Sequence, residues 1–214
     1  MSYLEQFFLI AAVHLLAVAS PGPDFAIILK QSIRYDRRTA IYTSLGIATG
    51  ILLHVTYSLV GIGLLIASDE RLFTALKYLA AGYFCYIAWH GLRAKKPEDL
   101  AEDPQVSSQK VNDIPSIKKS FFTGFLINGL NVKATLFFVS LFSVIIMPET
   151  PFAIKLSYGL YMTIATAAWF ILLSCLLTHT RVRAVLQKKG YLLDRVMGVV
   201  LLLLAVQLVL SDLN

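Results

Sequence analysis

Long apolar stretches recur along this chain, and each is long enough to cross a lipid bilayer. The hydrocarbon core of a bilayer is about 30 Å thick, a distance that an α-helix of about 20 residues spans. The stretches cover 4–30, 40–67, 72–92, 121–147, 152–178 and 191–210. Hydrophobic residues make up 57% of the 214 residues and charged residues 15%, so a soluble domain could not bury this much apolar surface. We therefore expect an all-α integral membrane protein with six transmembrane helices.

One polar segment divides the six stretches into two groups of three. It covers 93–119 and contains three prolines and charges of both signs, which is typical of a flexible loop. We expect a first three-helix repeat over 1–92 and a second over 120–214. Because each repeat has three helices, the second enters the membrane upside down relative to the first. Inverted repeats are common in secondary transporters, whose binding sites lie near the bilayer midplane at broken helices.

Basic residues are distributed unevenly between the two sets of loops. Fifteen of the 19 Lys and Arg residues follow the first, third and fifth stretches. Three lie in loops on the opposite side (Arg71, Lys77 and Lys155), and Lys133 lies inside the fourth stretch. Cytoplasmic loops carry an excess of Lys and Arg, so we expect the basic loops in the cytoplasm and both termini outside. The net charge of +6 thus follows from membrane topology and indicates no nucleic-acid partner.

The first apolar stretch is interrupted by the motif Pro21-Gly22-Pro23, which is followed directly by Asp24. Two prolines remove two backbone donors, and glycine weakens the helix further. Within a membrane such a break is tolerated where it is packed in protein or lines a wet cavity. The helix that restarts at Pro23 would present free N–H groups to a carboxylate, and Asp24 could exchange a proton. A simple packing kink with Asp24 as a helix cap is the alternative.

A second group of polar residues lies in the fourth stretch, where Asn128, Asn131 and Lys133 follow Gly124. A lysine within a membrane helix needs a partner, because burying it alone costs about 2.5–3.5 kcal/mol. Asp24 in the other repeat is the candidate partner, and the two asparagines would supply amide groups to the same cavity. The alternative places Lys133 near the membrane surface.

Two histidines are candidates for a proton relay. His14 precedes Asp24 by close to three helical turns, and His54 follows Gly46 and Gly50 in the second stretch. A histidine titrates near neutral pH, although a packing role is as consistent with either position. Gly46 and Gly50 are spaced so that two helices could approach closely, and exposed small-residue faces would permit a homodimer.

The run Ser20-Pro21-Gly22-Pro23-Asp24 and the run from Gly124 to Ala134, taken together, resemble the LysE/RhtB family of bacterial amino-acid exporters, most closely its threonine and homoserine exporters. The resemblance covers essentially the whole chain. It implies a secondary active exporter of small neutral amino acids in the bacterial inner membrane, driven by proton antiport, with no enzymatic activity and no cofactor. Family members commonly have proline where this chain has Val132, so we expect a weaker break in the fourth helix than in relatives.

The resemblance implies roles for the two polar groups. The substrate carboxylate would meet the restarted helix and Lys133, and its ammonium group would meet Asp24 and the amide oxygen of Asn128 or Asn131. A proton on Asp24 would then compete with the substrate. Which neutral amino acid is preferred stays open at this point.

Two other functions are compatible with a small membrane protein. Export of a metal cation of the cadmium type would need clustered Cys, His, Met or carboxylate ligands, whereas the histidines here are scattered. A thiol–disulfide carrier would need Cys85 and Cys175 close together across two helices. Neither cysteine belongs to a C-x-x-C motif, and no metal site is expected.

Overall fold

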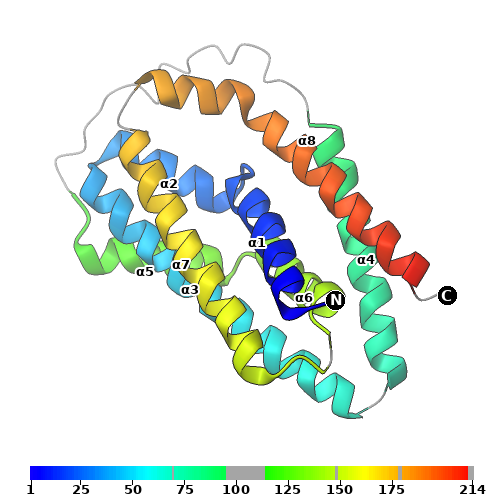
Figure 1. Cartoon of the computed structure of the whole chain (residues 1–214). Coiled ribbons are helices and arrows are strands. Elements are labelled where there is room, and N and C mark those ends of the chain that lie inside the picture. Colours follow the sequence, from blue (N-terminus) through cyan, green and yellow to red (C-terminus); the bar gives the residue numbers. More distant parts are fainter. Residues whose placement is uncertain (69, 95–113, 148, 178–179, 212–214) are drawn as a thin grey trace.

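The computed structural model describes residues 1–68, 70–94, 114–147, 149–177 and 180–211. The regular structure in these residues is α-helical (Figure 1). The helices are α1 (Tyr3–Ala19), α2 (Pro23–Arg34), α3 (Arg37–Ser68), α4 (Glu70–Leu92), α5 (Ile117–Gly129), α6 (Val132–Ile145), α7 (Phe152–Leu176) and α8 (Thr180–Ser211). Most of the expected linker over 93–119 lies outside the described residues.

Two of the apolar stretches are broken into pairs of helices. The axes of α1 and α2 differ by 51°, and those of α5 and α6 by 57°. By length and composition, the described residues provide two helices that can cross a membrane, within α3 and in α7, or up to four spans if each bent pair counts as one. The all-helical membrane fold is therefore as expected, while six spans in two inverted repeats stay a prediction.

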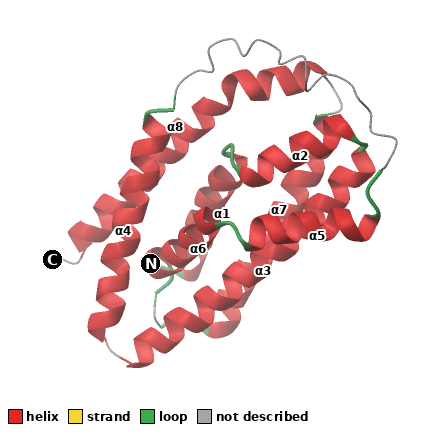
Figure 2. Cartoon of the chain, turned by 180° about the vertical axis from the view of Figure 1, so that it is seen from behind, coloured by secondary structure: helices red, strands yellow, loops and turns green. Residues whose placement is uncertain are grey.

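The helices form two packed groups with α1 and α6 between them. Opposite views place α4 beside α8 along one edge, and α2, α3, α5 and α7 together at the other (Figures 1 and 2). The larger core lies between the groups and includes the fully buried Ile10, Phe84 and Leu141. A smaller core packs Phe25 of α2 against Ile47 of α3 and Phe170 of α7. The central helices α1 and α6 thus contact both groups.

Glycines allow α3 and α5 to approach at backbone distance. A Cβ atom at Gly46 would overlap the Phe121 carbonyl oxygen, and one at Gly124 would overlap the Thr43 carbonyl oxygen. This close contact fixes α5 against α3, and with it the end of α5 that carries Asn128.

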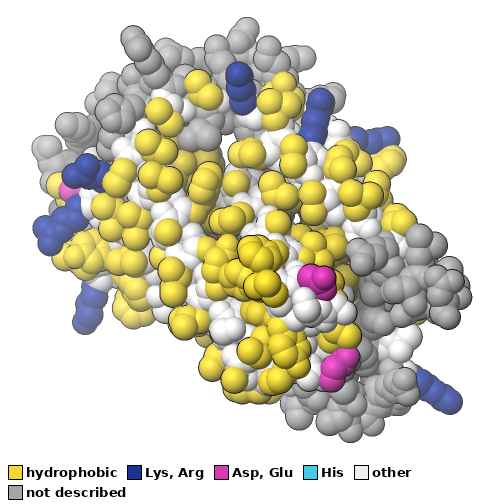
Figure 3. All heavy atoms as spheres, in the orientation of Figure 1, with side chains coloured by type: hydrophobic (Ala, Val, Ile, Leu, Met, Phe, Trp, Pro, Cys, Tyr) yellow, Lys and Arg dark blue, Asp and Glu magenta, His cyan; other side chains and the backbone are white. Residues whose placement is uncertain are grey.

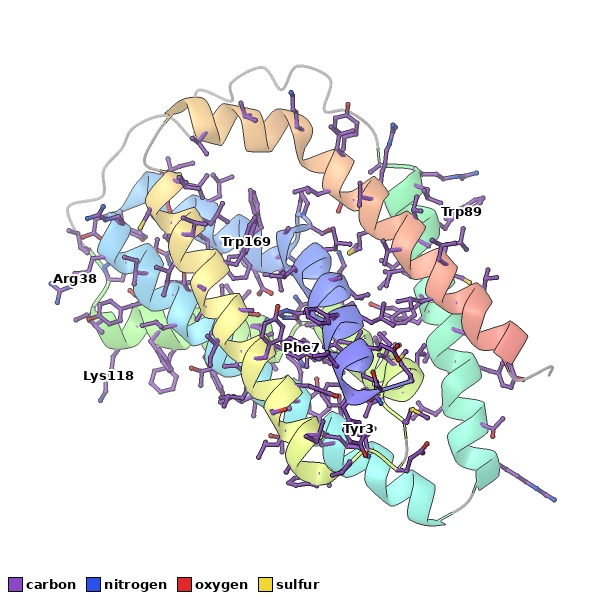
Figure 4. The ribbon with its side chains drawn as sticks, in the orientation of Figure 1. Tyr3, Phe7, Arg38, Trp89, Lys118 and Trp169 are labelled. Carbon is purple, nitrogen blue, oxygen red and sulfur yellow. The ribbon has the colours of Figure 1, made fainter. Side chains whose placement is uncertain are left out.

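Apolar side chains are widely exposed on the outside of the molecule. Leu79 and Leu130 are 72% and 77% exposed, which suits contact with lipid rather than water. In Figure 3 apolar side chains spread over the middle of the face, and Lys and Arg lie at its margins. Figure 4 shows Arg38 and Lys118 projecting from the same end of the molecule, with Tyr3 near the other end. The surface thus has an apolar middle and a basic end.

The start of α3 at this basic end is capped by Asp36, whose side-chain Oδ1 accepts a hydrogen bond of 2.7 Å from the Thr39 amide. Hydrogen bonds from the Thr39 side chain and backbone lower the pKa of Asp36.

Candidate functional site

The α1–α2 break exposes backbone donors at the start of α2. Helix α1 ends at Ala19, and Gly22 precedes α2 without any side-chain cap. The first turn of α2 closes with a 2.9 Å hydrogen bond from the Ala26 amide to the Gly22 carbonyl oxygen. The amides of Asp24 and Phe25 come before that bond, while Pro23 has no N–H to offer. The prediction of a break at Pro21-Gly22-Pro23 is confirmed, and two amides at the break are available to an anion.

Asp24 is held by an amide from the other half of the chain. Asn128 Nδ2 of α5 donates a 2.9 Å hydrogen bond to Asp24 Oδ2. Among the described residues, the buried Asp24 Oδ1 and Asn128 Oδ1 have no hydrogen-bond partner. A buried acceptor without a donor costs about 1–3 kcal/mol, so a ligand that donates hydrogen bonds to these atoms would remove this cost.

Asn131 makes the second break without a proline. Its Oδ1 accepts hydrogen bonds from the Lys133 and Ala134 amides, at 3.1 and 3.3 Å, and so caps the start of α6. Asn131 also lines the same cavity as Asp24. With Val132 in place of the usual proline, α5 and α6 still differ in direction by 57°, and the side-chain cap satisfies two amides at the start of α6. A weaker break than in relatives stays a prediction.

Lys133 lies in the first turn of α6 with an exposed side chain. It acts on Asp24 through Coulombic attraction rather than through a hydrogen bond. The Tyr83 hydroxyl of α4 donates to the Lys133 carbonyl oxygen at 3.1 Å and ties this turn to α4. Lys133 therefore remains available to a negatively charged ligand.

A cavity joins the two breaks. Its empty volume is about 630 Å³, including the part that opens to the outside, and it is lined by Gly22, Pro23, Asp24, Asn128, Asn131, Lys133 and His14, with mainly apolar side chains elsewhere. Pro21, expected at the substrate site, and His54, expected in a proton relay, do not line this cavity.

His54 of α3 supports the broken end of α5. Its Nε2 hydrogen-bonds with the Asn128 carbonyl oxygen at 3.0 Å, and its Nδ1 contacts the Tyr57 hydroxyl. Since a carbonyl oxygen only accepts, Nε2 carries the proton in this arrangement. His54 thus positions the residue that holds Asp24.

His14 is fully buried in the cavity wall and hydrogen-bonds through Nε2 with Thr166 of α7, at 3.1 Å. Phe138 of α6 lies between the two histidines, with its ring centroid 6.1 Å from that of His14 and 5.5 Å from that of His54. His14 Nδ1 has no hydrogen-bond partner among the described residues. Sequence reasoning missed Thr166 and Phe138, since no local motif marks either residue.

Gly50 of α3 provides room for Asn128. A Cβ atom at Gly50 would lie 2.6 Å from Asn128 Oδ1 and 3.0 Å from Asn128 Cβ. The sequence indicates a packing glycine here, and the structure shows that the side chain packed against it belongs to the site.

Export of a metal cation and thiol–disulfide exchange, the two alternative functions, find little support in the geometry. Within the described ranges, no group of three or more His, Cys, Asp or Glu residues could hold a metal ion. Cys85 lies on α4 and Cys175 on α7, and no disulfide joins them.

Comparison with known proteins gives the family. The model of the family described as "LysE type translocator" matches residues 15–212. A threonine efflux protein from Salmonella typhi is 28% identical over 97% of this chain and 99% of its own length. The threonine efflux protein of Escherichia coli strain K12 shows the same identity and coverage.

An uncharacterized membrane protein from Bacillus subtilis, YrhP, is 33% identical over 63% of this chain and 62% of its own length. No solved structure gives a significant match. The resemblance noted from the two motifs is confirmed by a match over most of the chain: it belongs to the LysE type translocator family, whose members are membrane transporters and not enzymes.

Proposed function

We propose that this protein exports small neutral amino acids, threonine or a close analogue such as homoserine, from the bacterial cytoplasm by proton antiport. One observation carries the proposal: two broken helices bring a carboxylate, amide groups and an ammonium group to one cavity. The relatives named as threonine efflux proteins support the same class of substrate.

Both charged groups of a free amino acid find complementary atoms in the cavity. The substrate ammonium group has three donors, and the unpartnered Asp24 Oδ1 and Asn128 Oδ1 are acceptors. The substrate carboxylate would meet the free amides at the start of α2 and the Lys133 ammonium group. Phe137, Phe138 and Phe170 line the remaining wall and favour a small side chain.

Proton coupling follows if Asp24 binds either a proton or the substrate ammonium group. A proton on Asp24 neutralises the carboxylate and weakens its attraction for the ammonium group. A proton entering from outside would therefore favour substrate release on that side. The coupling cannot exceed the difference in substrate affinity between protonated and ionised Asp24.

The membrane arrangement we propose has six spans, with α1–α2 equivalent to α5–α6, α3 to α7, and α4 to α8. Similar bends of 51° and 57° support the first equivalence. The excess of Lys and Arg in the loops after α2, α4 and α7 favours a cytoplasmic location for the basic end and termini outside.

The test uses purified protein in liposomes loaded with labelled L-threonine, with and without an opposing proton gradient. We expect gradient-stimulated efflux in the wild type and its loss in Asp24→Asn. Asp36→Asn is the matched control, because it makes the same change outside the cavity and asparagine also caps helices. Unchanged gradient stimulation in Asp24→Asn would contradict the coupling role, and absence of efflux for threonine and its analogues in the wild type would contradict the substrate class.

A further inference from the structure

A second hollow lies beside the central cavity, between α4, α8 and the start of α6. Its empty volume is about 1010 Å³, including the part open to the outside. Pro21 of the first break, Tyr83, Tyr86 and His90 of α4, and Asp194 of α8 line it. Ile87, Lys133 and Met197 line both this hollow and the central cavity, so the two spaces are neighbours.

The hollow is lined by one carboxylate and one ammonium group, together with the His90 imidazole. Asp194 of α8 is half-buried, and Lys133 of α6 lines the same space. A carboxylate and an ammonium group lining one hollow are complementary to a zwitterion, as in the central cavity. Asp194 precedes the apolar part of α8, a position where an acid has a cost unless it binds a partner.

Asp194 already has a partner at the boundary between the two spaces. The Ser20 hydroxyl donates a hydrogen bond to Asp194 Oδ1. Ser20 lines the central cavity and Asp194 lines the second hollow. Ser20 is the C-cap residue that directly follows α1, at the start of the break. The bond therefore connects the α1–α2 break to α8, and a substrate ammonium group at Asp194 would compete with it.

The backbone around Asp194 is fixed by close helix contact. A Cβ atom at Gly91 would overlap the Asp194 carbonyl oxygen, and one at Gly198 would lie 2.9 Å from the Ala88 carbonyl oxygen. Arg195 Nε donates a 3.1 Å hydrogen bond to the Ala94 carbonyl oxygen at the end of α4. The Asp194 carboxylate therefore projects from a rigid α4–α8 contact.

We propose that the second hollow is a separate binding site for the transported amino acid, next to the central cavity. Asp194 binds the substrate ammonium group after Ser20 releases it, and Lys133 binds the carboxylate and is shared with the central site. This inference rests on the proposed export of amino acids and adds a second acidic residue to the transport path.

Protection of a cysteine in the hollow tests the proposal. His90→Cys is made in a background with Cys85→Ala and Cys175→Ala, and its rate of reaction with a maleimide is measured with increasing L-threonine. We expect threonine to slow labelling severalfold when Asp194 is present and to have little effect in Asp194→Asn. Asp194→Glu should restore protection, which distinguishes loss of the carboxylate from loss of the fold.

Two further variants separate the second site from the central one. Asp24→Asn should leave protection of residue 90 intact, because Asp24 does not line the second hollow. Ser20→Ala should give protection at lower threonine concentrations, since it removes the competing hydrogen bond; a misfolded variant would not gain affinity.

Protection that persists in Asp194→Asn, disappears in Asp24→Asn, or is unchanged in Ser20→Ala would overturn the second site. Threonine efflux by the parent protein without protection would overturn it too and leave the proposed function standing. A parent protein that neither transports nor is protected by any amino acid would remove the proposed function, and the second site with it.

Discussion

Gly50 makes room for the side chain that holds Asp24, so its replacement by alanine tests the site without changing any residue that lines the cavity. The new methyl group would lie 2.6 Å from Asn128 Oδ1 and 3.1 Å from Asn128 Cγ. Overpacking of this kind costs about 1–3 kcal/mol. The Asn128 amide must move, and we expect it to lose its 2.9 Å hydrogen bond to Asp24.

The size of the effect follows from that bond. A hydrogen bond to a charged group contributes about 1.5–3 kcal/mol, and about 1.4 kcal/mol corresponds to a factor of ten. We therefore expect Gly50→Ala to lower threonine efflux in liposomes by about tenfold or more and to lower the thermal unfolding temperature in detergent.

The matched control is Gly61→Ala in the same helix, where a Cβ atom would meet nothing within 4 Å. It should leave efflux unchanged, and a helix-interior alanine gains about 1 kcal/mol over glycine. In an Asn128→Ala background, Gly50→Ala should cause a smaller drop in efflux and in unfolding temperature, because the amide atoms that the new methyl group would clash with are absent. The reasoning would be refuted if Gly50→Ala had the same effect in the wild type and in Asn128→Ala, or if Gly50→Ala and Gly61→Ala had the same effect on efflux.

Three other changes have defined outcomes. Asn131→Ala removes the cap of α6 and should destabilise the protein by about 0.5–2 kcal/mol in the thermal unfolding assay. Asn131→Ser should lose much less stability, because serine also caps helices, and equal losses in the two variants would contradict the capping role. Thr166→Val removes the partner of the buried His14 Nε2 and should cost about 1–3 kcal/mol, with a smaller cost in a His14→Phe background, where no ring nitrogen needs a partner. Hydrogen bonds from Thr39 lower the pKa of Asp36 in the folded protein. Ionised Asp36 therefore stabilises the folded state at pH values above its pKa in the unfolded chain, and this stabilisation is lost as the pH falls through its pKa in the folded protein. Asp36→Ala should therefore lower the free energy of unfolding near neutral pH but not in strong acid, as measured by unfolding over a range of pH. An equal loss at neutral and at acidic pH would contradict the role of the ionised Asp36 carboxylate.

The break of the first helix could be predicted because proline chemistry is local. Pro21 and Pro23 lack amide hydrogens whatever surrounds them, and α1 ends and α2 begins on either side of the motif. The second break could not be predicted from the same rule, since Val132 carries an amide. It depends on the orientation of the Asn131 side chain, which caps the new helix.

Most residues of the site could be predicted from the sequence, but their hydrogen-bond partners could not. Charge alone pointed to Lys133 as the partner of Asp24, whereas the structure places the Asn128 amide in hydrogen-bond contact with it. That pairing joins residues 104 positions apart and depends on how α5 packs against α3. An acid in the eighth helix, Asp194, was the one signal that could have indicated the second hollow.

The central claim is that a proton and the substrate ammonium group compete for Asp24. The most direct measurement is proton release when L-threonine binds to purified protein in weakly buffered detergent solution, followed with a pH indicator over a range from acidic to mildly alkaline. We predict release by the wild type at the pH values where Asp24 is protonated, and none by Asp24→Asn although it still binds threonine by calorimetry. Equal proton release by both proteins would contradict the claim and place the coupling proton on another residue.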